Sequence, residues 1–175
     1  MVFGPRLMQG PAGGGKVPKG GAVPIRIEAR IGVQAPAAVI WELLGDLPTW
    51  AAWCPIYPRA EGLLRINERL SLTLALPGLP EREITPRVID WMPEEQILWA
   101  DTAWRGWAKS VRYIEVDVLS ETGCIIANGE QFEGMFSELF AEKHRKAMKK
   151  GFIAFNEALK EQAETLWQDR QRKAR

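Results

Sequence analysis

Hydrophobic and polar residues alternate from Ile25 to Val33, where every second residue is apolar. A period of two is typical of a strand with one buried face. The same alternation from Leu70 to Leu76 predicts another strand, which the Pro77–Gly78 pair ends as a turn. Four more strands are predicted at about residues 83–91, 97–104, 111–119 and 124–132. The segments between the last of these are short enough for an antiparallel meander.

The segment from Ala35 to Pro58 follows a different pattern. Apolar residues recur at helical spacing from Val39 to Leu44, proline at position 36 suits a first helical turn, and glycine follows the last apolar residue. A second short helix is then expected to present Trp50 and Trp53. Because this segment joins the first two strands at one end of the sheet, we expect both tryptophans at the rim of a pocket.

A long helix is predicted from about Ser137 to Trp167, a stretch without proline. At 100° per residue, one apolar stripe contains Ala141, Met148, Phe152, Phe155, Leu159, Ala163 and Leu166. This stripe must pack against an apolar surface. The order of elements therefore predicts an α+β fold, β-α-α-β-β-β-β-β(-β)-α, in which one curved antiparallel sheet of six or seven strands wraps around the C-terminal helix.

The composition predicts one folded domain with two polar ends. The chain has 175 residues, 46% of them hydrophobic, which suits a single core. Residues 1–24 are rich in glycine and proline and predict a flexible leader, residues 25–167 form the expected single folded domain, and residues 168–175 form a basic tail. Each end carries a net charge of +3, so the domain carries −5 against a total of +1.

Several classes of function find no support in these numbers. A mildly acidic domain argues against nucleic-acid binding. No run of 18 apolar residues predicts an integral membrane segment, and the two cysteines, Cys54 and Cys124, have no metal-like spacing. We therefore expect a soluble, cytoplasmic protein with no cofactor and no metal, and its oligomeric state stays open.

Five sequence segments resemble the START-like, helix-grip superfamily, also called SRPBCC. They are APAAVIWELLGDLPTWAAWCP, GLLRINERLSLTLALPG, ITPRVIDWMPEEQILW, GEQFEG and GFIAFNEALKEQAE. The superfamily includes lipid-transfer domains, the major birch-pollen allergen, polyketide cyclases/dehydrases and coenzyme Q-binding chaperones. The chain looks closest to the bacterial polyketide cyclase/dehydrase-like branch. The resemblance covers roughly residues 25–166 and implies a ligand cavity between the sheet and the long helix.

Polar residues on apolar strand faces are the first candidates for contact with a ligand. Asn128 and Glu130 share a strand face with Cys124, Ile126 and Phe132. Burying them without a partner would cost about 1–3 kcal/mol each. Either they bind a ligand in the cavity, or the strand end is solvated and Glu130 pairs with an arginine.

Two further residues are candidates for proton transfer together with Glu130. Asp101 would face the cavity if Ile97 and Trp99 face inward, and burial would raise its pKa into the range of a general base. The alternative is an exposed Asp101. His144, the only histidine, lies at the edge of the helix stripe, where it could reach the cavity mouth or simply lie on a solvated cationic face.

The remaining candidates for the cavity wall come from three sources. These are the inward strand faces, the apolar stripe of the predicted long helix and the many tryptophans. The complete predicted ligand-binding set is Trp50, Trp53, Leu72, Leu74, Val88, Trp99, Val116, Ile126, Asn128, Glu130, His144, Met148 and Phe152.

Three functions remain in competition. The preferred hypothesis is a carrier or sensor that binds a hydrophobic or aromatic small molecule, such as a lipid, quinone or polyketide. The second is a polyketide cyclase/dehydrase-type enzyme that uses Asp101, Glu130 or His144 as acid or base. The third is a domain whose groove binds a protein partner. Few acid–base candidates are present, which favours binding.

Overall fold

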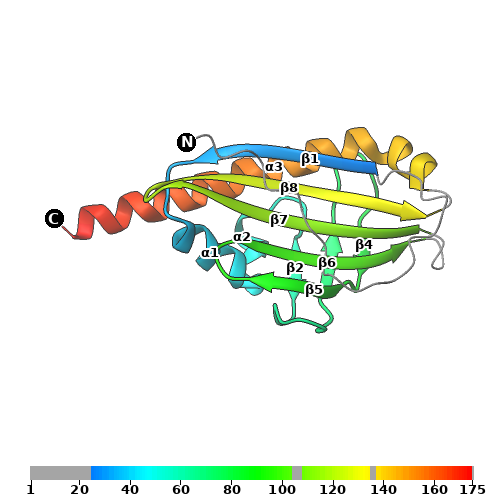
Figure 1. Cartoon of the computed structure of the whole chain (residues 1–175), viewed down its shortest axis with the longest axis horizontal. Coiled ribbons are helices and arrows are strands. Elements are labelled where there is room, and N and C mark those ends of the chain that lie inside the picture. Colours follow the sequence, from blue (N-terminus) through cyan, green and yellow to red (C-terminus); the bar gives the residue numbers. More distant parts are fainter. Residues whose placement is uncertain (1–24, 104–107, 135–136, 175) are drawn as a thin grey trace, which may run out of the picture.

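The computed structural model describes residues 25–103, 108–134 and 137–174, and its strands form two antiparallel sheets (Figure 1). The main sheet has the order β1-β8-β7-β6-β5 and the small sheet the order β2-β3-β4. In chain order the strands are β1 (Ile25–Val33), β2 (Arg59–Glu61), β3 (Ser71–Leu74), β4 (Arg82–Ile84), β5 (Arg87–Met92), β6 (Gln96–Ala103), β7 (Ala108–Ser120) and β8 (Gly123–Gly134).

The predicted α+β class with a curved antiparallel sheet and a long C-terminal helix is confirmed, but the strands divide differently. A single sheet of six or seven strands was expected, whereas five strands form one sheet and three form another. The predicted strand at residues 83–91 is split into β4 and β5 by Thr85 and Pro86. A proline has no N–H for a ladder hydrogen bond, so the pairing stops there and the chain passes from the small sheet to the main one.

Helix α3 (Ser137–Lys173) runs along one face of the main sheet and packs against β1 and β8. Its buried side chains follow the predicted stripe, except that Leu166 is only half-buried. The helix continues six residues beyond the predicted end at Trp167, so most of the expected basic tail is helical. Figure 1 shows this C-terminal part extending past the sheet. Arg170, Arg172 and Lys173 in the last turn suit the negative end of the helix dipole.

The segment between β1 and β2 forms the short helices α1 (Ala37–Gly45), η1 (Leu47–Thr49) and α2 (Trp50–Trp53). As predicted, Pro36 begins the first of them, and its carbonyl oxygen accepts hydrogen bonds from the backbone N–H groups of Val39 and Ile40. These helices cover one end of the space between α3 and the main sheet.

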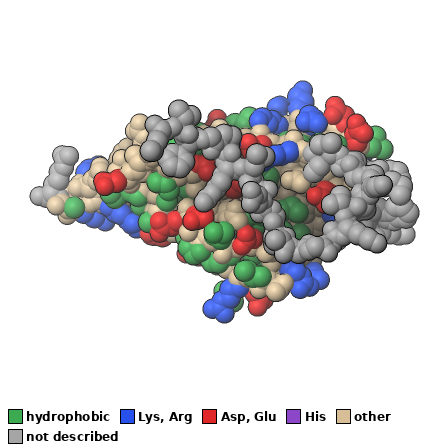
Figure 2. All heavy atoms as spheres, viewed as in Figure 1, with side chains coloured by type: hydrophobic (Ala, Val, Ile, Leu, Met, Phe, Trp, Pro, Cys, Tyr) green, Lys and Arg blue, Asp and Glu red, His purple; other side chains and the backbone are tan. Residues whose placement is uncertain are grey.

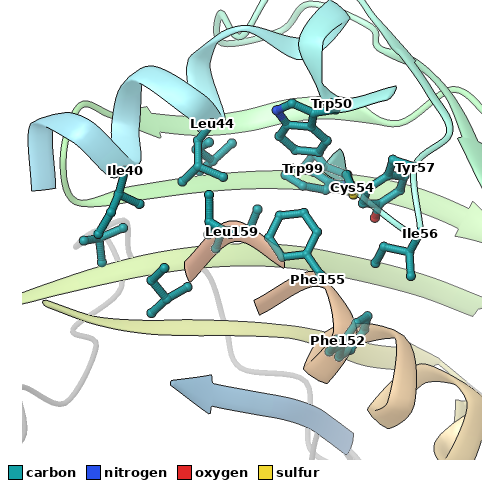
Figure 3. Packing of buried hydrophobic residues seen from close by; sticks show 14 of the residues in the cluster. Ile40, Leu44, Trp50, Cys54, Ile56, Tyr57, Trp99, Phe152, Phe155 and Leu159 are labelled. Atoms are coloured by element: carbon teal, nitrogen blue, oxygen red, sulfur yellow. The ribbon is translucent and has the colours of Figure 1, made fainter. Parts of the chain in front are cut away.

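Large aromatic side chains fill that end (Figure 3). Trp50 is completely buried, and its ring centroid lies 5.7 Å from that of Phe155 and 5.6 Å from that of Tyr57. The Nε1–H of Trp50 donates to the carbonyl oxygen of Leu43 over 3.1 Å, so its one polar atom is satisfied. Each such side chain contributes about 1.5–3 kcal/mol through burial. This end of the molecule is a solid core.

Both acidic and basic side chains are spread over the face shown in Figure 2, with apolar side chains between them. Among the residues that the structure describes, no helix combines the length and hydropathy that a membrane crossing requires.

Candidate functional site

A pocket of about 170 Å³ lies at the other end of α3. The β3–β4 hairpin and its turn form one wall, the first half of α3 forms the opposite wall, and β8 contributes at the base. The lining residues are Leu74, Leu76, Leu79, Pro80, Arg82, Glu130, Phe140, His144 and Met148. Most of this surface is apolar, and among the described residues its ionisable groups come from Arg82, Glu130 and His144.

A second, much smaller cavity of about 20 Å³ adjoins the first, because Leu74, Arg82 and Glu130 line both. Its remaining walls are Tyr57, Ile84, Trp99, Asp101, Ser110 and Arg112. We call the two cavities the outer pocket and the inner chamber. A cavity needs roughly 10–15 Å³ to hold one water molecule, so the inner chamber has room for about one oxygen atom. The outer pocket is mainly apolar, whereas the inner chamber has a larger share of polar and charged side chains in its lining.

The strand register brings the polar residues of the inner chamber together. Trp99 of β6 is opposite Arg112 of β7, and Arg112 is opposite Glu130 of β8. Asp101 and Ser110 form the next pair on the same face, because side chains two residues apart point the same way. Five residues from three neighbouring strands therefore share one small area of the sheet.

Arg112 is the central cation of this group and is only 3% exposed. Its Nη1 donates to the carbonyl oxygens of Gly129 at 2.7 Å and Tyr113 at 3.2 Å, and its Nε donates to the hydroxyl of Tyr57 at 3.4 Å. The guanidinium carbon lies 4.0 Å from the centre of the Phe152 ring, which adds a cation–π contact. The Nη2 atom is buried and has no hydrogen-bond partner among the described residues.

Glu130 lies half-buried between the outer pocket and the inner chamber. Burial raises the pKa of its carboxyl group, because a charged carboxylate loses hydration there, and nearby Asp101 adds to the effect. The positive charge of Arg112, a hydrogen bond with Ser110 and the positive charge of Arg82 each lower the pKa. Together they do not cancel the rise that burial causes. The carboxyl group is therefore easier to protonate than an ordinary glutamate.

Tyr57 closes the inner chamber on the side of the aromatic core. Its burial raises the pKa of the phenol, although the positive charge of Arg112 opposes the shift. The hydroxyl is thus a neutral group at physiological pH, able to donate a hydrogen bond while accepting one from Arg112.

His144 stands on α3 at the outer pocket, with its ring centroid 4.6 Å from that of Phe140. Burial lowers its pKa, and the positive charges of Lys143 and Arg82 lower it further. Its Nδ1 is buried without a hydrogen-bond partner among the described residues. The imidazole is therefore held in its neutral form, which can act as a base.

The structure places six of the residues singled out from the sequence around the two cavities. Leu74, Trp99, Asp101, Glu130, His144 and Met148 line them. Asp101 follows the inward alternative, since Ile97 and Trp99 are buried and Thr102 is exposed. Phe152 lines neither cavity, but its ring contacts Arg112, which lines the inner chamber.

The other predicted residues do not line either cavity. Leu72, Val88, Val116 and Ile126 are core side chains, and buried Asn128 donates a hydrogen bond to the carbonyl oxygen of Phe152. The expectation that Trp50 and Trp53 form a pocket rim is corrected. Both rings pack against Phe155, because α2 turns its aromatic side toward α3 and the filled core.

Arg112, Tyr57 and Arg82 line the inner chamber but are not among the residues predicted from the sequence. The strand pattern could have identified Arg112. Its side chain points to the same face of the strand as those of Ile114 and Val116, which are buried. Tyr57 and Arg82 lie beside a turn and in a three-residue strand, where no periodic pattern can assign a direction.

The described part of the chain contains no candidate metal site, and its buried Cys54 is not a reactive thiol. It contains no group of three or more His, Cys, Asp or Glu side chains that could hold a metal ion. Cys54 is buried, and burial raises the pKa of its thiol to about 12, which leaves no thiolate to act as a nucleophile.

A curved sheet around a long helix, with a partly polar pocket between them, defines the START-like class of helix-grip proteins. Comparison with known families agrees: residues 24–164 match the family described as "Polyketide cyclase / dehydrase and lipid transport", and the chain belongs to this family. No curated protein matches the chain. Family membership supports a ligand-binding or cyclase role.

Solved structures with the same fold are similar to this chain at low sequence identity. The Zhui aromatase/cyclase from a Streptomyces strain is 17% identical with a TM-score of 0.65, and the match covers 81% of this chain and 94% of that one. A START superfamily protein from Mycobacterium smegmatis is 16% identical with a TM-score of 0.65, covering 81% and 98%. A norcoclaurine synthase point mutant from Thalictrum flavum, in complex with a transition-state analogue, is 16% identical with a TM-score of 0.62, covering 81% and 94%.

Proposed function

We propose that this protein binds a small aromatic or otherwise apolar molecule in the outer pocket, as a carrier or sensor. The observation that carries the proposal is the division of the site: an apolar wall of leucine, phenylalanine and methionine side chains leads to a buried polar end. Ligand sites typically combine a mainly apolar lining with a few polar groups that fix orientation.

The size of the pocket limits the ligand. A dry cavity of roughly 150 Å³ in another protein accepts benzene. The outer pocket, at about 170 Å³, therefore suits a molecule with one or two rings, and a longer ligand would have to extend past the β3–β4 turn. Long-chain lipids are less favoured than compact aromatic molecules.

A titration with 2-naphthol tests binding, with calorimetry as the readout. Leu79→Trp enlarges a side chain that lines the pocket and is 36% exposed, so we expect a loss of affinity of about tenfold or more with little loss of stability. Leu139→Trp is the matched control, because Leu139 is 63% exposed on α3 and does not line the pocket.

The proposal fails if wild-type protein binds neither 2-naphthol nor naphthalene, or if the two tryptophan variants bind alike. Native mass spectrometry of the protein purified from its source provides an independent measurement, with a co-purifying apolar ligand as the expected result.

An enzymatic function of the cyclase/dehydrase type is the second candidate, and one specific observation favours it. Glu130 and His144 line the same pocket, and their surroundings shift their pKa values toward each other, upward for the acid and downward for the base. Shifted pKa values cluster at functional sites, and a general acid or base works best when its pKa lies near the working pH. In an aldol cyclisation, the base would remove a proton from the carbon beside one ketone, that carbon would bond to a second carbonyl carbon, and the resulting alkoxide would take up a proton.

Turnover of poly-β-ketone analogues tests this candidate. We expect His144→Ala and Glu130→Gln each to lower the rate by about 10²-fold or more, as for loss of a general acid or base, and Asp101→Asn to have a smaller effect. Unchanged rates in all three variants would dismiss the mechanism while leaving the binding proposal intact.

A further inference from the structure

The inner chamber contains a hydrogen-bond donor that is not paired with any of the described residues. Arg112 is 97% buried, given its exposed fraction of 3%, and its Nη1 and Nε donate to protein oxygens while Nη2 has no partner among the described residues. A buried donor without an acceptor costs about 1–3 kcal/mol, and more when the group is charged. An acceptor supplied by a ligand would remove that cost.

The surroundings of Arg112 hold the guanidinium in place for such an acceptor. The Phe152 ring lies 4.0 Å from the guanidinium carbon, the Trp99 ring lies 5.8 Å away, and two backbone carbonyls accept from Nη1. These contacts fix the plane of the guanidinium, so the direction of Nη2 is set before a ligand arrives. Little conformational entropy remains to be lost on binding.

The partners around the chamber include acceptors as well as donors. Glu130 and Asp101 present carboxyl groups, and Tyr57 and Ser110 present hydroxyls. A hydroxyl group on a ligand can accept from Arg112 and donate to Glu130 at the same time, whereas a bare ring can do neither.

Resting on the proposed function, we propose that the inner chamber is a subsite for one hydroxyl oxygen of a phenol-like ligand, with Arg112 Nη2 as its donor and Glu130 as its acceptor. The aromatic body of the ligand lies in the outer pocket between Leu79 and Met148. The hydroxyl lies between Arg112 and Glu130, which face each other across β7 and β8.

The size of the inner chamber also favours a ligand with a single oxygen atom over one with a carboxylate. At about 20 Å³ it holds one oxygen atom and not the two of a carboxylate. A carboxylate would also bring a negative charge toward Glu130 and Asp101. The subsite therefore favours a phenol over the carboxylic acid of the same ring system.

Three probes that share one ring system test the subsite on unmodified protein: naphthalene, 2-naphthol and 2-naphthoate, titrated by calorimetry at pH 7. We expect 2-naphthol to bind about tenfold or more tightly than either of the others, since a hydrogen bond to a charged group is worth roughly 1.5–3 kcal/mol and each 1.4 kcal/mol is a factor of ten. Equal binding of naphthalene and 2-naphthol, or equal or tighter binding of 2-naphthoate, would overturn the subsite but leave ligand binding established. No binding of any probe would overturn the proposed function as well.

A variant pair then assigns the effect to the guanidinium. Arg112→Met keeps the length of the side chain but removes the donors, so we expect the preference for 2-naphthol over naphthalene to disappear while naphthalene affinity changes less than threefold. Arg65→Met, at an exposed loop position outside both cavities, is the control and should keep the full preference. A preference that survives in folded Arg112→Met would exclude Arg112 as the donor. If that variant does not fold, Arg112→Lys, which keeps the charge but lacks Nη2, takes its place and should lose most of the preference.

Discussion

The two ends of the space between α3 and the main sheet have opposite characters. At the end covered by α1 and α2, Trp50 and Phe155 pack with almost no exposed surface. At the end covered by the β3–β4 hairpin, Leu79 and Met148 leave a pocket of about 170 Å³ between them. The helix and the sheet are common to both ends, so the covering segment decides which end is filled.

The difference follows from the side chains that each covering segment directs into the space between α3 and the main sheet. A short helix can turn two tryptophan rings toward α3, and these rings fill the gap. The β3–β4 turn carries leucine and proline, and it lies close to α3 at Gly151, where an added Cβ would lie 2.8 Å from Leu76 Cδ2. Leu79 and Pro80 of the same turn line the outer pocket together with side chains from the first half of α3.

The largest expected effect comes from matched phenylalanine truncations on α3. Phe155→Ala removes a completely buried ring at the filled end and should lower the free energy of unfolding by about 3–5 kcal/mol. Phe140→Ala removes a ring that already borders the pocket, so we expect about 1–2 kcal/mol. Urea unfolding of both variants measures the contrast, and equal losses would contradict the distinction between a filled end and an open one.

An intermediate effect is expected in the pH dependence of stability at the pocket end. Because the folded-state pKa of Glu130 is raised above its ordinary value, the folded protein binds more protons than the unfolded chain between those two pKa values. The contribution of Glu130 to stability is thus most favourable at pH values below about 4.5, and it falls as the pH rises through the folded-state pKa.

Glu130→Gln removes this titration. The difference in the free energy of unfolding, variant minus wild type, should rise with pH above about 4.5 and then level off. Any pH-independent cost of losing the carboxylate beside Arg112 shifts that curve without changing its slope. Unfolding curves collected from pH 4 to 8 provide the measurement, and a flat difference would show that Glu130 titrates normally.

The smallest effect concerns His144. Since burial and nearby cations lower its pKa, its single imidazole signal in NMR should titrate below 6.5. Lys143→Gln removes one of these cations and should move the midpoint upward by a few tenths, a size expected for screened surface charges. Lys146→Gln, an exposed position outside the pocket, should leave it in place. A midpoint at or above 6.5 in wild-type protein would contradict the desolvated position of His144.

Much of the framework was predictable, because strands and helices leave periodic patterns. The alternation in β1 and β8, the stripe on α3 and the proline at the start of α1 all predicted elements that the structure contains. Period-two parity also placed Glu130 on the apolar face of β8, although its contact with the cavity stayed open, and it offered the inward position for Asp101. The same rule applied to β7 would have found Arg112.

Other features left no pattern to read. Thr85 and Pro86 interrupt what looked like one strand, and the resulting division into two sheets depends on pairing between distant segments. The direction of Trp50 depends on how a four-residue helix packs against α3, and four residues are too few to define an amphipathic face. Tyr57 precedes β2 and Arg82 lies on β4, so both line the chamber through contacts between segments that are distant in the chain.

The sequence by itself determined the class of fold, the long apolar stripe of α3 and the strand face that Glu130 shares with Ile126 and Phe132, since each is a local property of backbone period and side-chain direction. The tertiary structure alone decided which end of the molecule stays hollow and which polar groups meet there. Arg112 and Glu130 are paired across the neighbouring strands β7 and β8, whereas Tyr57 lies 55 residues before Arg112 in the chain. Their meeting depends on strand register and on long-range packing, which no local pattern records.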